Sequence, residues 1–96
     1  MAVTFEWDSA KANVNLKKHK VSFDEASTVF GDPLAKIFFD EDHSTQENRE
    51  LIIGHSENNR LVLVSFTERR ADVVRIISAR IATKNERKAY EESKGG

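Results

Sequence analysis

Residues 60–80, with the sequence RLVLVSFTERRADVVRIISAR, decide the fold. Two short runs rich in β-branched residues lie on either side of a charged segment, and this pattern predicts neighbouring strands at residues 61–67 and 73–80. Residues 68–72 form the expected turn. Side chains alternate between the two faces of a strand, so the first strand is expected to present Val62, Val64, Phe66 and Glu68 on one face.

Two arginines, Arg75 and Arg80, interrupt the second apolar run. A regular strand places them on opposite faces, and a β-bulge between them would bring them to the same face. A guanidinium inside an apolar strand is costly unless it meets an anion or a carboxylate of the same chain. Both interpretations stay open: the arginines bind phosphate, or they form ion pairs with Glu68, Glu50 or Asp72.

The length of 96 residues predicts one small domain, residues 1–92, with a frayed tail at residues 93–96. The chain has no cysteine, which excludes disulfides and thiolate zinc sites. No apolar run approaches the roughly 18 residues that span a membrane, and the polar N-terminus is unlike a signal peptide. We therefore expect a cytoplasmic protein without membrane contact.

The net charge of −1 conceals an uneven distribution. Residues 1–48 carry five lysines and nine acidic residues, whereas residues 49–96 carry ten basic and seven acidic residues. All seven arginines lie in the second half. Because guanidinium groups bind phosphates and carboxylates through two parallel hydrogen bonds, this half is expected to hold a site for a polyanion. Surface arginines without such a role are the alternative.

The N-terminal half is expected to hold a short edge strand at residues 3–7 and two helices. Asp8 is a suitable N-cap for a helix over residues 9–19. Ser22 and Glu25 have the spacing of a capping box, which predicts that a second helix starts there. Gly31 and Pro33 then end this helix.

Further strands are expected at residues 34–39 and 49–55, on either side of a polar loop. The pair Asn58-Asn59 favours a tight turn before the hairpin at residues 60–80, because asparagine tolerates positive φ. Thr83 to Glu86 is a second capping box, which opens a last helix to about residue 92.

These elements predict an α+β fold: a short N-terminal strand, two helices, an antiparallel sheet of three to four further strands and a C-terminal helix. The helices are expected to cover one face of the sheet and to leave the other face open.

The three histidines, His19, His43 and His55, show no metal-ligand spacing. His43 lies among acidic residues of the polar loop, but loops commonly collect such residues, so we expect neither a metal nor a cofactor. His19 is a candidate general acid or base, because imidazole titrates near neutral pH. A structural histidine at the end of a helix is the alternative.

Several short motifs follow one another in an order typical of one protein family. They are FEWD at 5–8, NLKKHKV at 15–21, SFDEA at 22–26, VFGDP at 29–33, LIIG at 51–54, FTER at 66–69, RIISARIAT at 75–83 and ER with a following tyrosine at 86–90. Together, over residues 5 to about 92, they resemble BrnT-type toxins. This resemblance implies a RelE-like ribonuclease of a type II toxin–antitoxin system that halts translation by cutting RNA.

The resemblance also implies a partner. A BrnA-type antitoxin with a ribbon-helix-helix domain would neutralise the toxin, and the complex would repress its own operon, so that operator DNA is contacted through the antitoxin. One position departs from the family pattern, which has glycine after Lys-His where this chain has Lys20. A left-handed helix exit is costly for lysine, so the first helix is expected to end differently.

Metal-independent cleavage of RNA across the open sheet face needs a base for the 2′-hydroxyl, an acid for the leaving oxygen and positive charge at the phosphate. The catalytic candidates are Arg69, Arg75 and Arg80 as the positive charges and Glu68 or His19 as the base or acid. The RNA-binding candidates are Lys18, Arg49, Arg70 and Lys84. Of the two strand arginines, Arg80 is preferred for the RNA because it lies at a strand end.

Two other functions stay open. One is a basic module that binds RNA or an acidic protein partner without catalysis, and the other is an antitoxin-binding scaffold whose active site has decayed.

Overall fold

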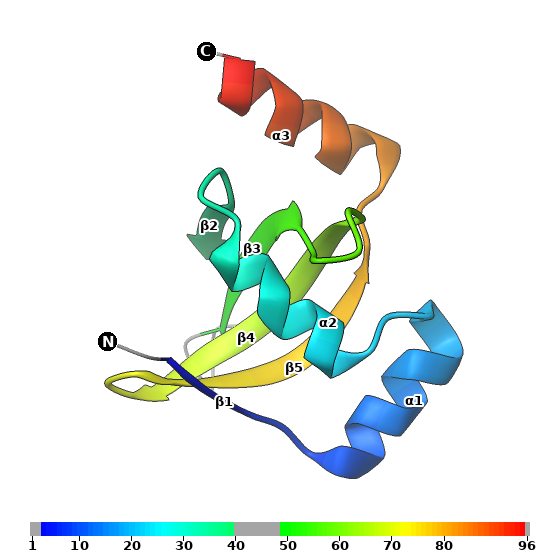
Figure 1. Ribbon diagram of the computed structural model, residues 1–96, viewed down its shortest axis with the longest axis vertical. Coiled ribbons are helices and arrows are strands. Elements are labelled where there is room, and N and C mark those ends of the chain that lie inside the picture. Colours follow the sequence, from blue (N-terminus) through cyan, green and yellow to red (C-terminus); the bar gives the residue numbers. More distant parts are fainter. Residues whose placement is uncertain (1–2, 40–48, 96) are drawn as a thin grey trace.

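The computed structural model describes residues 3–39 and 49–95. The polar loop with His43 lies outside them. Within these two segments, three helices, one short 3-10 turn and five strands follow one another (Figure 1). In chain order these are β1 (Thr4–Glu6), α1 (Ser9–His19), α2 (Phe23–Thr28), the 3-10 turn η1 (Val29–Gly31), β2 (Lys36–Phe39), β3 (Arg49–His55), β4 (Leu61–Arg70), β5 (Val73–Ile81) and α3 (Lys84–Gly95).

The five strands form one sheet in the order β1-β5-β4-β3-β2. The strand β1 pairs with β5 in parallel, and the other neighbouring strands are antiparallel. The predicted α+β fold is therefore confirmed, with a short N-terminal edge strand and four further antiparallel strands. The element bounds differ in places: β4 continues to Arg70, β2 begins at Lys36, and α3 extends to Gly95 rather than ending near residue 92.

One face of the sheet is covered by α1, α2 and η1. The side chains of Val62, Val64 and Phe66 pack there against those of the helical segments. The main core cluster consists of Val21, Phe23, Ala26, Val29, Ile52, Val62, Val64, Phe66, Val74, Ile76 and Ala79. Each of these side chains is less than a tenth exposed, so the burial that stabilises the fold is concentrated on this covered face.

The residues that flank α1, Asp8 and Lys20, cap its two ends. The carboxylate of Asp8 accepts hydrogen bonds from the backbone N–H groups of Ala10 and Lys11, at 2.8 and 3.1 Å. These bonds lower the pKa of Asp8. At the other end Lys20 adopts the left-handed conformation, with φ 62°, and its N–H donates to the carbonyl of Leu16. The expectation of a different exit was wrong: the helix ends in left-handed geometry although the residue is a lysine.

A buried asparagine joins α1 to the sheet. The Asn15 side chain accepts a hydrogen bond from the N–H of Ala79 and donates to the carbonyls of Ala79 and Val21. These contacts satisfy backbone groups of β5 beyond the point where its pairing with β1 ends at Arg75. The helix α1 is therefore fixed beside the free edge of β5.

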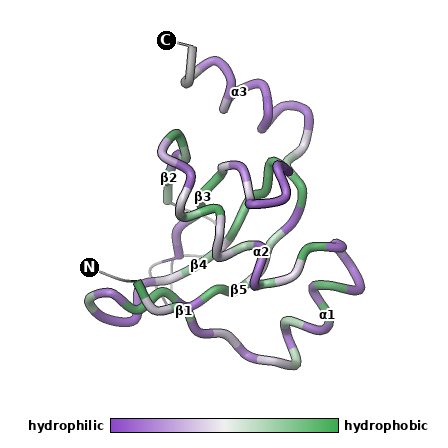
Figure 2. Tube along the Cα trace, in the orientation of Figure 1, coloured by the Kyte–Doolittle hydropathy of each residue, from purple (hydrophilic) through white to green (hydrophobic). Residues whose placement is uncertain are grey.

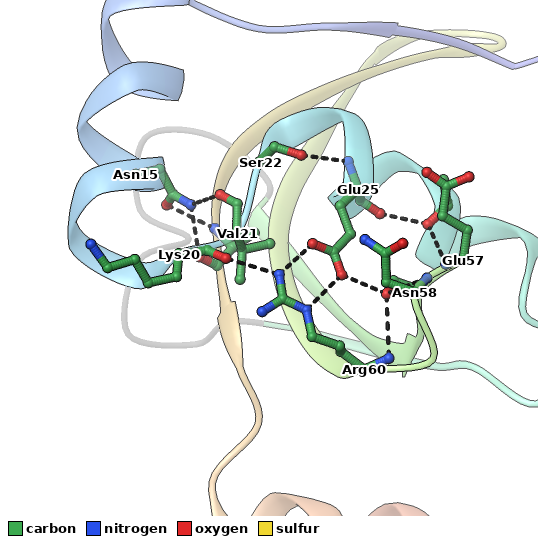
Figure 3. A network of polar contacts seen from close by, with 11 residues as sticks. Asn15, Lys20, Val21, Ser22, Glu25, Glu57, Asn58 and Arg60 are labelled. Atoms are coloured by element: carbon green, nitrogen blue, oxygen red, sulfur yellow. Dashed lines mark hydrogen bonds and ion pairs between the residues drawn. The ribbon is translucent and has the colours of Figure 1, made fainter.

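The start of α2 uses only half of its predicted capping box. The Ser22 hydroxyl accepts the N–H of Glu25 at 3.0 Å, as expected. The Glu25 carboxylate, however, turns to the Ser56 hydroxyl and to the guanidinium of Arg60 (Figure 3). The same guanidinium donates to the carbonyl of Lys20 at 2.8 Å. The hydrogen bonds from Arg60 and, after it, from Ser56 lower the pKa of Glu25. Together the contacts of Arg60 tie the loop after α1 to the turn before β4.

The helix α3 lies against the opposite face of the sheet, so the expectation that all helices cover one face was wrong. It is hydrophilic along most of its length (Figure 2), and its buried Tyr90 packs with Ile53, Leu61 and Leu63 in a second cluster. The Tyr90 hydroxyl donates to Asp32 at 2.9 Å. Burial, together with this bond, raises the pKa of Tyr90 to about 12.

Candidate functional site

A β-bulge in β5 decides which side chains reach the face opposite α1 and α2. Along β4 and β5 the register pairs Ser65 with Ser78, but the next pair along is Phe66 with Ile76. The extra residue is therefore Ile77. A bulge of this kind reverses the alternation on one side of the extra residue.

The bulge brings the two strand arginines to one face. Arg75 is the partner of Thr67, and Arg80 is the partner of Leu63. Directly opposed residues of antiparallel strands point to the same side, and positions 63 and 67 of β4 lie on one side. This side, which α1 and α2 do not cover, is called the open face below.

A row of polar side chains crosses the open face. Neighbouring strands align Glu6 of β1 with Arg75 of β5, Arg75 with Thr67 of β4, and Thr67 with Arg49 of β3. We call these four residues the cross-sheet row. They form a band that runs over four strands, at the end of the sheet away from α3.

Two arginines of this region meet one carboxylate. The Arg75 Nη1 lies 3.1 Å from Glu6 Oε2, and the Arg69 Nε lies 3.9 Å from the same oxygen. The three side chains are between about a third and half exposed. A ligand can therefore reach a carboxylate and two guanidinium groups at one place. The predicted partners of Arg75, which were Glu68, Glu50 and Asp72, were wrong, because the carboxylate comes from the edge strand.

The other strand arginine, Arg80, forms an ion pair with a residue of α3. Its Nη1 and Nη2 donate to the two carboxylate oxygens of Glu86 at 2.8 and 2.9 Å. Glu86 also closes the predicted capping box, because it accepts from the N–H of Thr83 while its own N–H donates to the Thr83 hydroxyl. The Arg80 guanidinium is the main reason that the pKa of Glu86 falls to about 2.

The remaining candidates lie apart from the cross-sheet row. Glu68 is exposed and pairs with the buried Val74, which places it toward the covered side of the sheet. Arg70 is exposed at the turn between β4 and β5, and Lys84 is exposed at the start of α3. The structure brings Arg69, Arg75 and Arg49 toward one another, but it does not bring Glu68 to them.

His19 and Lys18 lie in a separate groove between α1 and β5, with a volume of about 360 Å³. Ile77 and Ser78 form its β5 wall. His19 is half-buried there, and neither it nor Lys18 belongs to the cross-sheet row.

Sequence reasoning missed Glu6. This residue lies in a three-residue strand whose partner, β5, is almost seventy positions away in the chain. The only signal was an acidic residue in the apolar entry segment, which a solvent-exposed position explains equally well. Parallel pairing with β5 gives Glu6 its role beside Arg75.

Among the residues that the structure describes, no three histidine or acidic side chains gather closely enough to hold a metal ion. Within the same residues, no helix has the length and apolar character to cross a membrane.

Comparison with known proteins shows what this fold is similar to. The solved structure of the Brucella abortus ribonuclease toxin BrnT matches with a TM-score of 0.66 and 24% sequence identity. The match covers 86% of this chain and 100% of the Brucella chain, so the two share a fold. No curated protein sequence matches significantly.

The family model described as the ribonuclease toxin BrnT of type II toxin–antitoxin systems matches residues 7–86, which is most of the chain. The order of motifs along the sequence, the fold and this match agree. The chain belongs to the BrnT family of ribonuclease toxins.

Proposed function

We propose that the protein is an endoribonuclease that cleaves RNA without a metal ion, and that the cross-sheet row with Arg69 is its cutting centre. The observation that carries the proposal is the meeting of Glu6 with Arg75 and Arg69 on the open face. Cleavage needs positive charge close to the oxygens of the scissile phosphate, where negative charge develops in the transition state. It also needs a nearby base that takes the proton of the 2′-hydroxyl.

In the proposed reaction the Glu6 carboxylate accepts the proton of the 2′-hydroxyl. The 2′-oxygen attacks the adjacent phosphorus, a 2′-O–P bond forms, and the bond from phosphorus to the 5′-oxygen breaks. The products are a 2′,3′-cyclic phosphate and a 5′-hydroxyl, whose proton comes from solvent. Arg75 and Arg69 stabilise the negative charge of the pentacovalent phosphate, as preorganised donors do at other oxyanions.

Glu6 takes the place that the sequence alone assigned to Glu68 or His19. Glu68 lies toward the covered side, and His19 lies in the groove beside α1. The Glu6 carboxylate oxygen lies beside the two guanidinium groups that would hold the phosphate, so it is placed to accept the proton. Arg49 and Arg70 extend the positive charge along the RNA. Arg80 supports α3 instead, since its two donor nitrogens are occupied by Glu86.

The family description implies an antitoxin, and we propose that it is of the BrnA type, with a ribbon-helix-helix domain that contacts operator DNA. An acidic segment of this partner would neutralise the exposed guanidinium groups and exclude RNA. We further propose that the toxin acts in the cytoplasm, where it inhibits translation.

The test is cleavage of a single-stranded RNA by purified wild-type protein in the presence of EDTA, beside Arg75→Ala and the control Lys88→Ala. Lys88 is exposed on α3, so its loss removes the same charge far from the row. We expect Arg75→Ala to cut about 10²–10³-fold more slowly, as the loss of one oxyanion donor does. The control should match the wild type, and the products should end in cyclic phosphate.

Circular dichroism must show that both variants are folded. A wild-type protein that binds RNA but leaves it intact would refute the ribonuclease mechanism. Loss of cleavage with EDTA would refute metal independence. Cleavage by Arg75→Ala at the wild-type rate would show that the cutting centre does not include Arg75.

A further inference from the structure

The groove between α1 and β5 combines basic and apolar walls. On its helical side Lys11, Val14 and Lys18 follow one another at spacings of three and four residues, so they form one stripe along α1. The Val14 side chain is 62% exposed. Along this stripe Val14 thus lies between Lys11 and Lys18, and His19 lies at the end.

The opposite wall is made by the bulge of β5. Ile77 is the extra residue at the bulge, and it lines the groove together with Ser78. A bulge re-aims a side chain away from the regular alternation of the strand. Here the bulge that brings Arg75 and Arg80 to one face also supplies the apolar residue that faces α1.

The groove borders the open face at Ser78. Ser78 lines the groove, and its β4 partner Ser65 lies on the open face between the partners of Arg75 and Arg80. Three residues of strand separate Ser78 from Arg75, which corresponds to about 10 Å. A strand of RNA held at Arg75 can therefore continue over β5 and enter the groove.

We propose that this groove is a second RNA subsite, which binds a nucleotide beyond the two that flank the scissile phosphate. The base contacts Val14 and Ile77, and the ammonium groups of Lys11 and Lys18 contact the flanking phosphates. Sites for single-stranded nucleic acid combine a basic groove with side chains on which bases stack, typically aromatic ones, and they do not read sequence through hydrogen bonds. In this groove the aliphatic Val14 and Ile77 would take the place of the aromatic side chains. The inference rests on the proposed function, because it takes the RNA to lie along the open face.

The test measures binding rather than cleavage, so it stays informative even if the proposed reaction is wrong. The probes are a fluorescent 2′-O-methyl RNA of about eight nucleotides, which fits the usual length of such sites, and the corresponding dinucleotide. The groove variant is Lys11→Ala with Lys18→Ala. The matched control is Lys17→Ala with Lys88→Ala, which removes the same two charges from exposed positions outside the groove.

For the oligomer, the groove variant should lower the slope of log affinity against log salt by about 1.4, the value for two phosphate contacts on a single strand. With equal binding of the two proteins at 1 M salt, this corresponds to about 25-fold weaker binding by the groove variant at 0.1 M salt. Binding of the dinucleotide, which reaches only the cross-sheet row, should not change. The control should keep the wild-type slope.

Two results would overturn the inference: wild-type oligomer affinity in the groove variant, or an equal loss in the control, which would show that net charge alone is responsible. Loss of dinucleotide binding by the groove variant would also overturn the inference, because the groove and the cross-sheet row would then not be two separate subsites. Failure of the proposed reaction gives a different result: in the cleavage assay, the protein binds unmodified RNA but leaves it intact.

Discussion

Replacement of Arg80 by methionine tests whether this arginine stabilises α3 or acts on RNA. Methionine keeps most of the apolar stem but removes the two hydrogen bonds to Glu86. The pKa of Glu86 lies at about 2 in the folded protein, against an ordinary 4.5. This difference corresponds to at most about 3 kcal/mol. Because the two side chains are 39% and 29% exposed, solvent screening reduces the expected loss to about 1–2 kcal/mol.

The loss should depend on pH in a defined direction. The folded pKa of Glu86 is depressed, so the pair contributes its full stability above about pH 4.5 and loses it as the pH falls toward 2. The difference between wild type and Arg80→Met should therefore be constant near neutral pH and should shrink below pH 4.5. Urea unfolding followed by circular dichroism measures both free energies, and Arg87→Met on the exposed side of α3 is the control.

At neutral pH the melting temperature of Arg80→Met should fall by about 4–12 °C, and that of the control should not change. The rate of RNA cleavage, measured well below the melting temperature, should stay within a few-fold of wild type. A stability difference that is absent at pH 7 or unchanged at low pH would refute the assignment. A loss of cleavage of 100-fold or more in a folded variant would return Arg80 to the catalytic set.

Three further substitutions test the fold around the site. Lys20→Gly should raise the free energy of unfolding by about 0.5–1 kcal/mol in urea titration, because glycine adopts φ 62° without strain; an unchanged value would show that the lysine is not strained. Gly54→Ala should cost about 1–3 kcal/mol, since its Cβ would lie 2.9 Å from that of Ala35; a thermal melt equal to wild type would contradict this close approach. Glu25→Gln should lower the free energy of unfolding by about 2 kcal/mol, because it leaves the Arg60 guanidinium without its buried carboxylate. Asp24→Asn on the same helix should change the free energy of unfolding by less than about 0.5 kcal/mol, and equal effects of the two substitutions in chemical denaturation would refute a special role for the Glu25–Arg60 pair.

The local elements could be predicted from the sequence because each depends on neighbouring residues. Asp8, Ser22 and Thr83 mark helix starts through hydrogen bonds that span three positions, and all three caps are observed. The bounds of α1 and β3 were predicted without error. The positive φ of Asn59 in the turn before β4 is another local property, and it too is confirmed.

What the sequence could not supply is long-range. The bulge at Ile77 depends on how β5 fits β4, and no residue type in RIISAR requires it. The carboxylate of Glu6 reaches Arg75 through a parallel pairing between the two ends of the chain. Glu25 has the spacing of a capping box, yet the arginine that it binds lies thirty-five positions away. In each case tertiary contacts outweigh a local signal.

The role of Glu6 as the general base is tested by the single-turnover cleavage rate of Glu6→Gln. Glutamine keeps the shape of the side chain and still accepts a hydrogen bond from Arg75, but it is a far weaker base. We expect a rate about 10²–10⁴-fold below wild type, with RNA affinity retained and the fold intact. A folded Glu6→Gln protein that cleaves RNA at the wild-type rate would contradict this role, and the base would have to be sought outside the cross-sheet row.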